Sequence, residues 1–261
     1  MFFSAIQRKE RTMSFVKKDV QEGIATLTIS RGKVNALAGD VIRQLRQDFA
    51  ALEMDPSTRA IVLTGEGKFF SFGFDIPEFL PYSREDFLAY LIHFTDLYTT
   101  MFVHPKPVVA ALNGHAIAGG CMLALACDRR VMVSGKARIS LNEISFGSSV
   151  FAGSTEMLRF CLGSRYATEV LYSGALYSAE KAKALGLIDE VATEETLLET
   201  ARKEARDMGQ KSGSAFKSIK MLLRGPVAED MKRREKASLK EFVEIWYSAP
   251  TRENLKKIKI Y

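Results

Sequence analysis

The sequence predicts an α/β fold in which parallel strands are joined by crossover helices. Short runs of alternating or wholly apolar residues are typical of strands, and longer segments with apolar residues at helical spacing are typical of helices. The two patterns alternate through the first two thirds of the 261 residues. Such alternation is the unit from which parallel sheets are built.

The elements follow in order along the chain. Residues 24–30 alternate as in a half-buried strand, and residues 60–64, 108–112 and 130–133 form three further strands. A helix lies near residues 86–101, and a glycine-led helix precedes the strand at 130–133. The segment after the first strand is predicted to be a helix, because apolar residues recur there at helical spacing: Val41, Ile42, Leu45, Phe49 and Leu52.

From about Ser164 the chain is predicted to be mostly helical. The expected helices span residues 165–172, 179–185, 194–208, 215–223 and about 228–246. The last one needs a surface against which to bury an apolar stripe of Met231, Leu239, Phe242, Val243 and Trp246. We therefore expect three parts: an N-terminal extension (1–13, with Met1 or Met13 as the natural start), a core (14–195) and a C-terminal helical region (196–261).

Composition restricts the class of protein. With 47% hydrophobic and 26% charged residues, the chain can bury a full core, and it is neither disordered, membrane-spanning nor of low complexity. Cys121, Cys127 and Cys161 are odd in number and show no Cys-x-x-Cys pairing, as expected of reduced, buried thiols. The first residues lack an apolar segment long enough for a secretory signal, so a cytoplasmic location is expected.

The most informative segment is residues 113–128, where a loop leads directly into an apolar helix. Gly119 and Gly120 have no Cβ, so a ligand can approach their backbone N–H groups closely. The first turn of a helix also has free N–H groups and a partial positive charge. The segment could stabilise an anion, or the glycines could serve only tight packing.

A second glycine segment favours the first interpretation. Residues 65–76 follow the strand at 60–64 and are too rich in glycine and aromatic residues for a simple turn. They are expected to supply a second backbone donor.

Three segments give the chain a family resemblance: KVNAL at 33–37, FSFGFDI at 70–76 and NGHAIAGGCMLALACD at 113–128. In this order and spacing they resemble the crotonase superfamily, also called the enoyl-CoA hydratase/isomerase family, from about Ser14 onward. The resemblance implies a crotonase (ClpP-like) spiral fold of repeated ββα units with a C-terminal helical trimerisation region. It also implies an acyl-CoA substrate and a homotrimer or hexamer.

The resemblance assigns roles to individual residues. The backbone N–H groups of Phe74 and Gly119 would form an oxyanion hole for a thioester enolate. Pro77 stands where hydratases often have a basic residue, so Lys33, Lys68 or C-terminal basic residues would hold the coenzyme A phosphates. The positions implied to bind substrate are Val34, Ala36, Leu37, Asp75, Ile76, Pro77, Gly120, Met122 and Leu141.

The acid–base groups differ from those of hydratases, which use two glutamates. Met122 occupies the first position, and a thioether cannot transfer a proton. Glu143 keeps the second, and Leu141-Asn142-Glu143 resembles the segment of mitochondrial Δ3,Δ2-enoyl-CoA isomerases, which work with a single Glu. An apolar pocket would raise the pKa of Glu143 and make it a better proton shuttle. The alternative is a surface acid in a strand-to-helix loop.

The function that the resemblance implies is isomerisation of 3-enoyl-CoA to 2-enoyl-CoA in fatty-acid breakdown. The alternatives are another single-acid reaction (weak hydratase, decarboxylase or thioesterase) and a non-catalytic acyl-CoA-binding or RNA-binding homologue. The net charge of +6 suits a coenzyme A tail, RNA or a solvated basic surface, and nucleic acid is the less favoured partner. No cofactor beyond the substrate's own coenzyme A and no metal site are expected. A structural role is expected for His93, His104, Asp75 and Asp128, and Ser71 lacks the Gly-x-Ser-x-Gly frame of a catalytic nucleophile.

Overall fold

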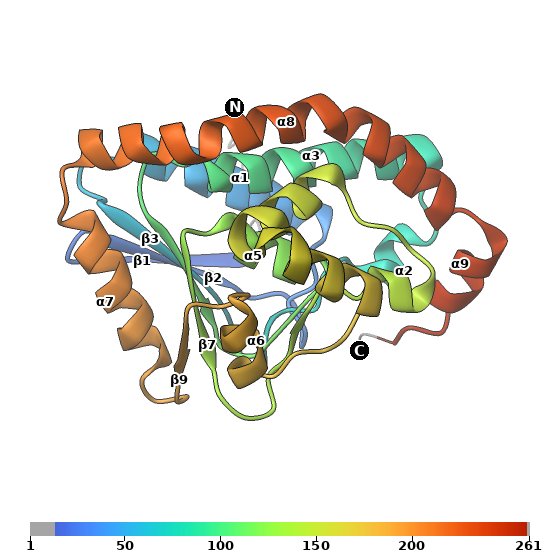
Figure 1. The fold of residues 1–261 in the computed structure, drawn as a ribbon, viewed down its shortest axis with the longest axis horizontal. Helices are drawn as coiled ribbons and strands as arrows, with labels where there is room; N and C mark the ends of the chain where they lie inside the picture. Colours follow the sequence, from blue (N-terminus) through green and yellow to red (C-terminus); the bar gives the residue numbers. More distant parts are fainter. Residues whose placement is uncertain (1–13, 260–261) are drawn as a thin grey trace, which may run out of the picture.

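A six-stranded sheet organises the molecule (Figure 1). The computed structural model describes residues 14–259, so the expected N-terminal extension lies outside the described residues. In spatial order the strands are β1 (Val16–Gln21), β2 (Ile24–Ile29), β3 (Ala60–Gly65), β5 (Val108–Leu112), β7 (Arg129–Val133) and β9 (Glu190–Ala192). The parallel pairing of β2, β3, β5, β7 and β9 confirms the predicted sheet.

The strand at one edge was not predicted from the sequence, and it is antiparallel. β1 pairs with β2 in antiparallel register, with Val16 opposite Ile29. Only Glu22 and Gly23 separate the two strands, which is too short for a crossover helix. The chain must therefore turn back as a hairpin, and both of these residues have positive φ angles.

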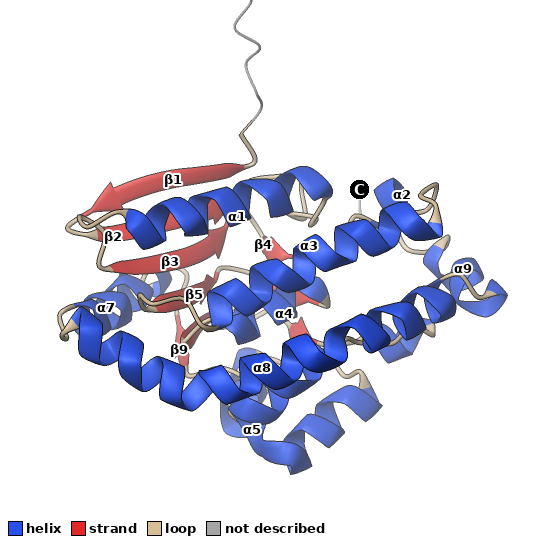
Figure 2. Ribbon diagram, turned by 90° about the horizontal axis from the view of Figure 1, so that it is seen from above, coloured by secondary structure: helices blue, strands red, loops and turns tan. Residues whose placement is uncertain are grey.

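Helices cover both faces of the sheet, as parallel strands require. Helix α7 (Leu197–Gly209) packs on one face, where Ala201 and Ala205 meet alternate strand residues such as Val62 and Val109. The other face packs against α1 (Gly39–Met54), α3 (Arg84–Phe102) and α4 (Gly119–Ala126). Figure 2 shows α8 (Gly213–Trp246) running alongside α3.

A second, three-stranded sheet positions the site. Its parallel strands are β4 (Phe69–Ser71), β6 (His115–Ile117) and β8 (Ile139–Ser140). Each follows a strand of the large sheet, so β3–β4, β5–β6 and β7–β8 are successive pairs, and each pair leads into helical structure. This succession is the predicted spiral of ββα units.

Short helices complete the core: α2 (Ile76–Phe79), the 3₁₀ helix η1 (Glu143–Phe146), α6 (Ala179–Leu185) and α9 (Ala249–Leu255). Helix α5 (Ala152–Ser173) begins well before the predicted residue 165 and is interrupted at Gly163, whose φ is 71°. The helix predicted at 165–172 corresponds to the part of α5 after this interruption.

Helix α8 replaces the two helices predicted at 215–223 and 228–246. It continues through Pro226, and the neighbouring Arg224, Gly225 and Ala228 are buried. Tertiary packing therefore offsets the backbone hydrogen bond that proline removes. All five residues of the predicted apolar stripe are buried within this chain. In the described part of the chain, no helix is both long and apolar enough to cross a membrane.

Two side chains of α8 hold the beginning of α5. Glu235 accepts a hydrogen bond from the Gly153 N–H at 2.7 Å and another from the Tyr98 hydroxyl at 2.6 Å. Ser238 Oγ accepts one from the Ala152 N–H at 3.0 Å. These contacts satisfy N–H groups that a helix start leaves free, and they fix the end of α8 over the core.

Candidate active site

Three loops meet where the small sheet ends. The segment of Phe72, Gly73 and Phe74 follows β4, Ala118 and Gly119 follow β6, and the segment leading to Glu143 follows β8. Parallel neighbouring strands bring their carboxyl ends to one edge, which is where α/β folds bind ligands. The three residues expected to be catalytic, Phe74, Gly119 and Glu143, therefore come together.

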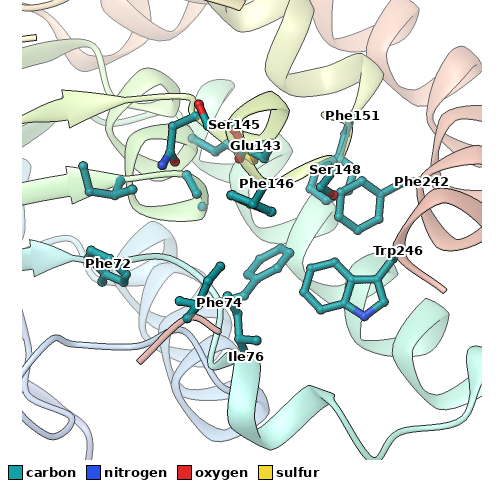
Figure 3. Close-up of a pocket in the computed structure, with 16 residues that line it drawn as sticks. Phe72, Phe74, Ile76, Glu143, Ser145, Phe146, Ser148, Phe151, Phe242 and Trp246 are labelled. Atoms are coloured by element: carbon teal, nitrogen blue, oxygen red, sulfur yellow. The ribbon is translucent and has the colours of Figure 1, made fainter. Parts of the chain in front are cut away.

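These residues line a cavity of about 270 Å³ (Figure 3). Ile76 and Met122, both expected to bind substrate, line it as well. The walls are mostly apolar and aromatic. Such a cavity suits an acyl chain with a few polar groups that act on it.

Close backbone contact joins the first two loops. Gly73 has a φ of 92°, and a Cβ there would lie 2.9 Å from Ile117 O and 3.1 Å from Gly119 N. The loop is fixed by hydrogen bonds from Gly73 N–H to Ser71 Oγ at 3.1 Å and from Leu37 N–H to Gly73 O at 2.8 Å. Only glycine allows this approach, which brings the Phe74 backbone beside the start of α4.

The two predicted donors are both free in the described chain. Neither the Phe74 N–H nor the Gly119 N–H donates a hydrogen bond to a described residue. Gly119 is the first residue of α4, so its N–H has no partner within the helix. Ala118 precedes it with φ 50° and ψ −118°, a strained conformation for a residue with a Cβ. The arrangement fits an oxyanion hole.

The sequence left open whether Gly119 and Gly120 stabilise an anion or serve tight packing, and the two glycines differ in this respect. A Cβ on Gly120 would lie 2.4 Å from Ser71 O, so this glycine serves close packing. A Cβ on Gly119 would lie 3.2 Å from the Phe74 ring, and Gly119 itself faces the cavity.

Glu143 is the first residue of η1 and is 4% exposed. Its burial contradicts the alternative of a surface acid. Oε2 has no hydrogen-bond partner among the described residues. Burial in this apolar cavity raises the pKa of Glu143 to about 8. A hydrogen bond from its own backbone N–H lowers the pKa, but by less than burial raises it. A carboxyl group with this pKa can both take and return a proton near neutral pH.

Met122 lies on α4, is 1% exposed and faces the same cavity. Among the described residues that line the cavity, Glu143 alone carries a carboxylate. Between residues 14 and 259, no group of three or more His, Cys, Asp and Glu side chains could hold a metal ion.

The other residues expected to bind substrate do not line the cavity. Asp75 caps α2 by accepting from the Glu78 N–H at 3.2 Å and forms an ion pair with Arg31, which is the structural role expected of it. Pro77 is exposed on α2. The remaining five are buried next to the loops rather than at the cavity surface: Val34, Ala36, Leu37, Gly120 and Leu141.

One end of the cavity was not predicted from the sequence. It is built from aromatic residues that the chain brings from the start of α5 and the end of α8, namely Phe151, Phe242 and Trp246. Phe146 of η1 and Ile258 also contribute. The stripe on α8 showed that Phe242 and Trp246 are buried, but no local signal places them beside Glu143.

Comparison with known proteins gives a consistent result. The family model for enoyl-CoA hydratase/isomerase matches residues 19–257. A putative enoyl-CoA hydratase of Thermus thermophilus is 35% identical over 192 residues, which cover 72% of this chain and 75% of the relative. The mitochondrial enoyl-CoA hydratase of Pongo abelii is 34% identical over 231 residues, covering 84% and 77%.

Among solved structures, the human mitochondrial Δ3,Δ2-enoyl-CoA isomerase superposes with a TM-score of 0.89 at 26% identity. The match covers 93% of this chain and 96% of that one. Hydratase and isomerase name different reactions, so the acid–base groups of the cavity must distinguish them.

Proposed function

Since the chain belongs to the enoyl-CoA hydratase/isomerase family, we propose that it converts 3-enoyl-CoA to 2-enoyl-CoA in acyl-CoA breakdown. The observation that carries the proposal is the single carboxylate, Glu143, in an apolar cavity beside two free backbone N–H groups.

The proposed steps follow from these groups. The thioester carbonyl oxygen accepts hydrogen bonds from the N–H groups of Phe74 and Gly119, which stabilise the negative charge that develops there. The ionised Glu143 removes a proton from C2, and the electrons spread over a dienolate. Glu143 then returns the proton to C4, so the double bond moves from C3–C4 to C2–C3 without consuming water. The carboxylate is restored for the next turnover.

Hydration is the second candidate, because relatives by sequence carry that name. Adding water requires a group that orients the water molecule besides the group that transfers its proton. Met122 cannot act in this way, because a thioether cannot transfer a proton, and Glu143 is the only carboxylate among the described residues that line the cavity. Isomerisation is therefore the reaction that the residues favour.

The test is a panel of 3-enoyl-CoA and 2-enoyl-CoA thioesters followed for conjugation, hydration and hydrolysis. We expect conjugation of the 3-enoyl thioesters to exceed hydration of the 2-enoyl thioesters at every chain length that binds. Faster hydration would favour the second candidate. Tight binding with no turnover of any thioester would favour a non-catalytic acyl-CoA-binding protein.

The raised pKa of Glu143 predicts how activity depends on pH. The first step needs the ionised carboxylate, whose fraction increases as pH rises through about 8. We expect kcat/KM to rise about tenfold per pH unit between pH 6 and 7.5 and to level off above pH 9. A rate that is flat from pH 6 to 9 would mean that Glu143 is not the base.

Assembly as a homotrimer or hexamer is also proposed. The apolar stripe of α8 is buried within the chain, but the N-terminal half of the helix exposes a cluster of large apolar side chains. Ile219, Met221, Leu222 and Leu223 are 57%, 43%, 76% and 61% exposed. We expect sedimentation equilibrium at micromolar concentration to give a trimer or hexamer. A clean 29.1 kDa monomer would contradict this.

A further inference from the structure

The cavity contains a polar side chain that the proposed reaction does not use. Ser148 lies between η1 and α5 and is 7% exposed. Its Oγ is buried without a hydrogen-bond partner among the described residues. Its backbone N–H donates to Glu143 O at 3.0 Å, so its position relative to the proposed base is fixed.

Buried polar atoms without a partner are concentrated at this cavity. Nine such side-chain atoms occur in the described part of the chain, and four belong to residues that line it: Asn142, Glu143, Ser148 and Trp246. Native proteins leave few such atoms unpaired, and a cluster of them needs an explanation such as a bound ligand. Glu143 is explained by the proposed reaction, and the other three are not.

The surroundings of Ser148 indicate which part of a ligand it would meet. Figure 3 shows Ser148 close to Phe151 and Phe242, with Trp246 on the same side of the cavity. Phe72 lies on the opposite side, and Phe74 lies between the two. We take the thioester to lie at Phe74 and Gly119 and the remote part of the acyl group to lie on the side with Ser148, where Phe151, Phe242 and Trp246 form an apolar wall.

The nature of that remote part follows from hydrogen bonding. A saturated hydrocarbon tail would contact the aromatic walls but leave the Ser148 hydroxyl unpaired, and it would exclude the water that could pair it. A tail that carries an oxygen atom would satisfy the hydroxyl and keep the aromatic contacts. Trp246 Nε1, a donor only, is a second group that an oxygen could satisfy.

We infer that this site selects an acyl group with a hydrogen-bonding oxygen, a carbonyl or hydroxyl, on the part remote from the thioester, and that Ser148 Oγ binds it. This rests on the proposed function, because it assumes an acyl-CoA in the cavity. Ser148 is then a specificity-determining residue.

The test is calorimetric binding of saturated thioesters, which cannot isomerise. Each pair matches an oxo-acyl-CoA with the methyl-branched acyl-CoA of equal heavy-atom count: 4-oxopentanoyl with 4-methylpentanoyl, 5-oxohexanoyl with 5-methylhexanoyl, and 6-oxoheptanoyl with 6-methylheptanoyl. In at least one pair, we expect the oxo compound to bind about tenfold more tightly. Ser148→Ala should abolish that preference. The control is Ser149→Ala, which alters a half-buried neighbour outside the cavity and should retain the preference.

Three results would overturn the inference while leaving the proposed function intact. They are equal or tighter binding of the branched compound in all pairs, a preference that persists in Ser148→Ala, and a marked fall in Tm of Ser148→Ala without ligand. The last would show that the hydroxyl has a structural partner, whereas removing an unpaired hydroxyl should leave Tm unchanged or raise it. If no thioester of the series binds, the proposed function fails together with the inference.

Discussion

Replacing Glu143 by Gln is expected to lower conversion of 3-enoyl-CoA by about a thousandfold, because the variant loses the only carboxylate among the described cavity residues. Glutamine keeps the size and hydrogen-bonding capacity of the side chain but cannot accept the C2 proton at neutral pH. Binding of a saturated acyl-CoA should persist. The measurements are the steady-state rate with a 3-enoyl-CoA and calorimetric binding of the saturated thioester.

The matched control is Glu169→Gln, the same substitution at an exposed position of α5. It should leave the rate unchanged. Glu143→Gln should be at least as stable as the parent at pH 8, because it removes a buried carboxyl group that is costly to ionise. Parental turnover in Glu143→Gln would remove this residue from the mechanism.

Replacing Gly119 by Pro is expected to lower turnover by about a hundredfold or more, the usual effect of losing one oxyanion-hole donor. Proline removes the N–H that is free at the start of α4, and its fixed φ is compatible with the first turn of a helix. The rate with a 3-enoyl-CoA is compared with that of the parent, after circular dichroism confirms that the variant is folded.

Gly119→Ala is the control for the added side chain. It retains the N–H but places a Cβ 3.2 Å from the Phe74 ring and 3.3 Å from Leu37 Cδ1. The difference between the two variants isolates the hydrogen bond from the crowding. If folded Gly119→Pro is as active as Gly119→Ala, the Gly119 N–H does not stabilise the oxyanion.

Long, periodic elements could be predicted from the sequence, whereas the small sheet could not. Helix α1 was located because its buried residues recur at helical spacing, and β5 because five apolar residues stand together. The strands β4, β6 and β8 have only two or three residues each, too few for any period to show. Their parallel pairing arises from long-range contacts.

The same distinction applies to the site. Gly119 and Glu143 were located by motifs within single loops, and the structure places both at the cavity. Phe151 and Phe242 lie far apart along the chain, yet their ring centroids are 4.6 Å apart, and Glu235 and Ser238 hold the start of α5 against α8 beside them. Local sequence patterns carry no information about such a contact. Leu37 and Gly120, predicted to bind substrate, do not line the cavity and instead contact Gly73 in the loop after β4 and Ser71 of β4 itself, respectively.

The claim that one glutamate moves the proton within the substrate is tested most directly by an isotope transfer experiment. A 3-enoyl-CoA carrying two deuterium atoms at C2 is converted in ordinary water by the parent protein, and the product is examined by mass spectrometry and NMR. Because Glu143 is buried, we expect its proton to exchange only partly with water. The main product should then be 2-enoyl-CoA that carries part of the removed deuterium at C4, and 3-hydroxyacyl-CoA should not be the main product. A product whose new C4 hydrogen comes entirely from solvent, or hydration as the main reaction, would contradict a single shuttling carboxylate.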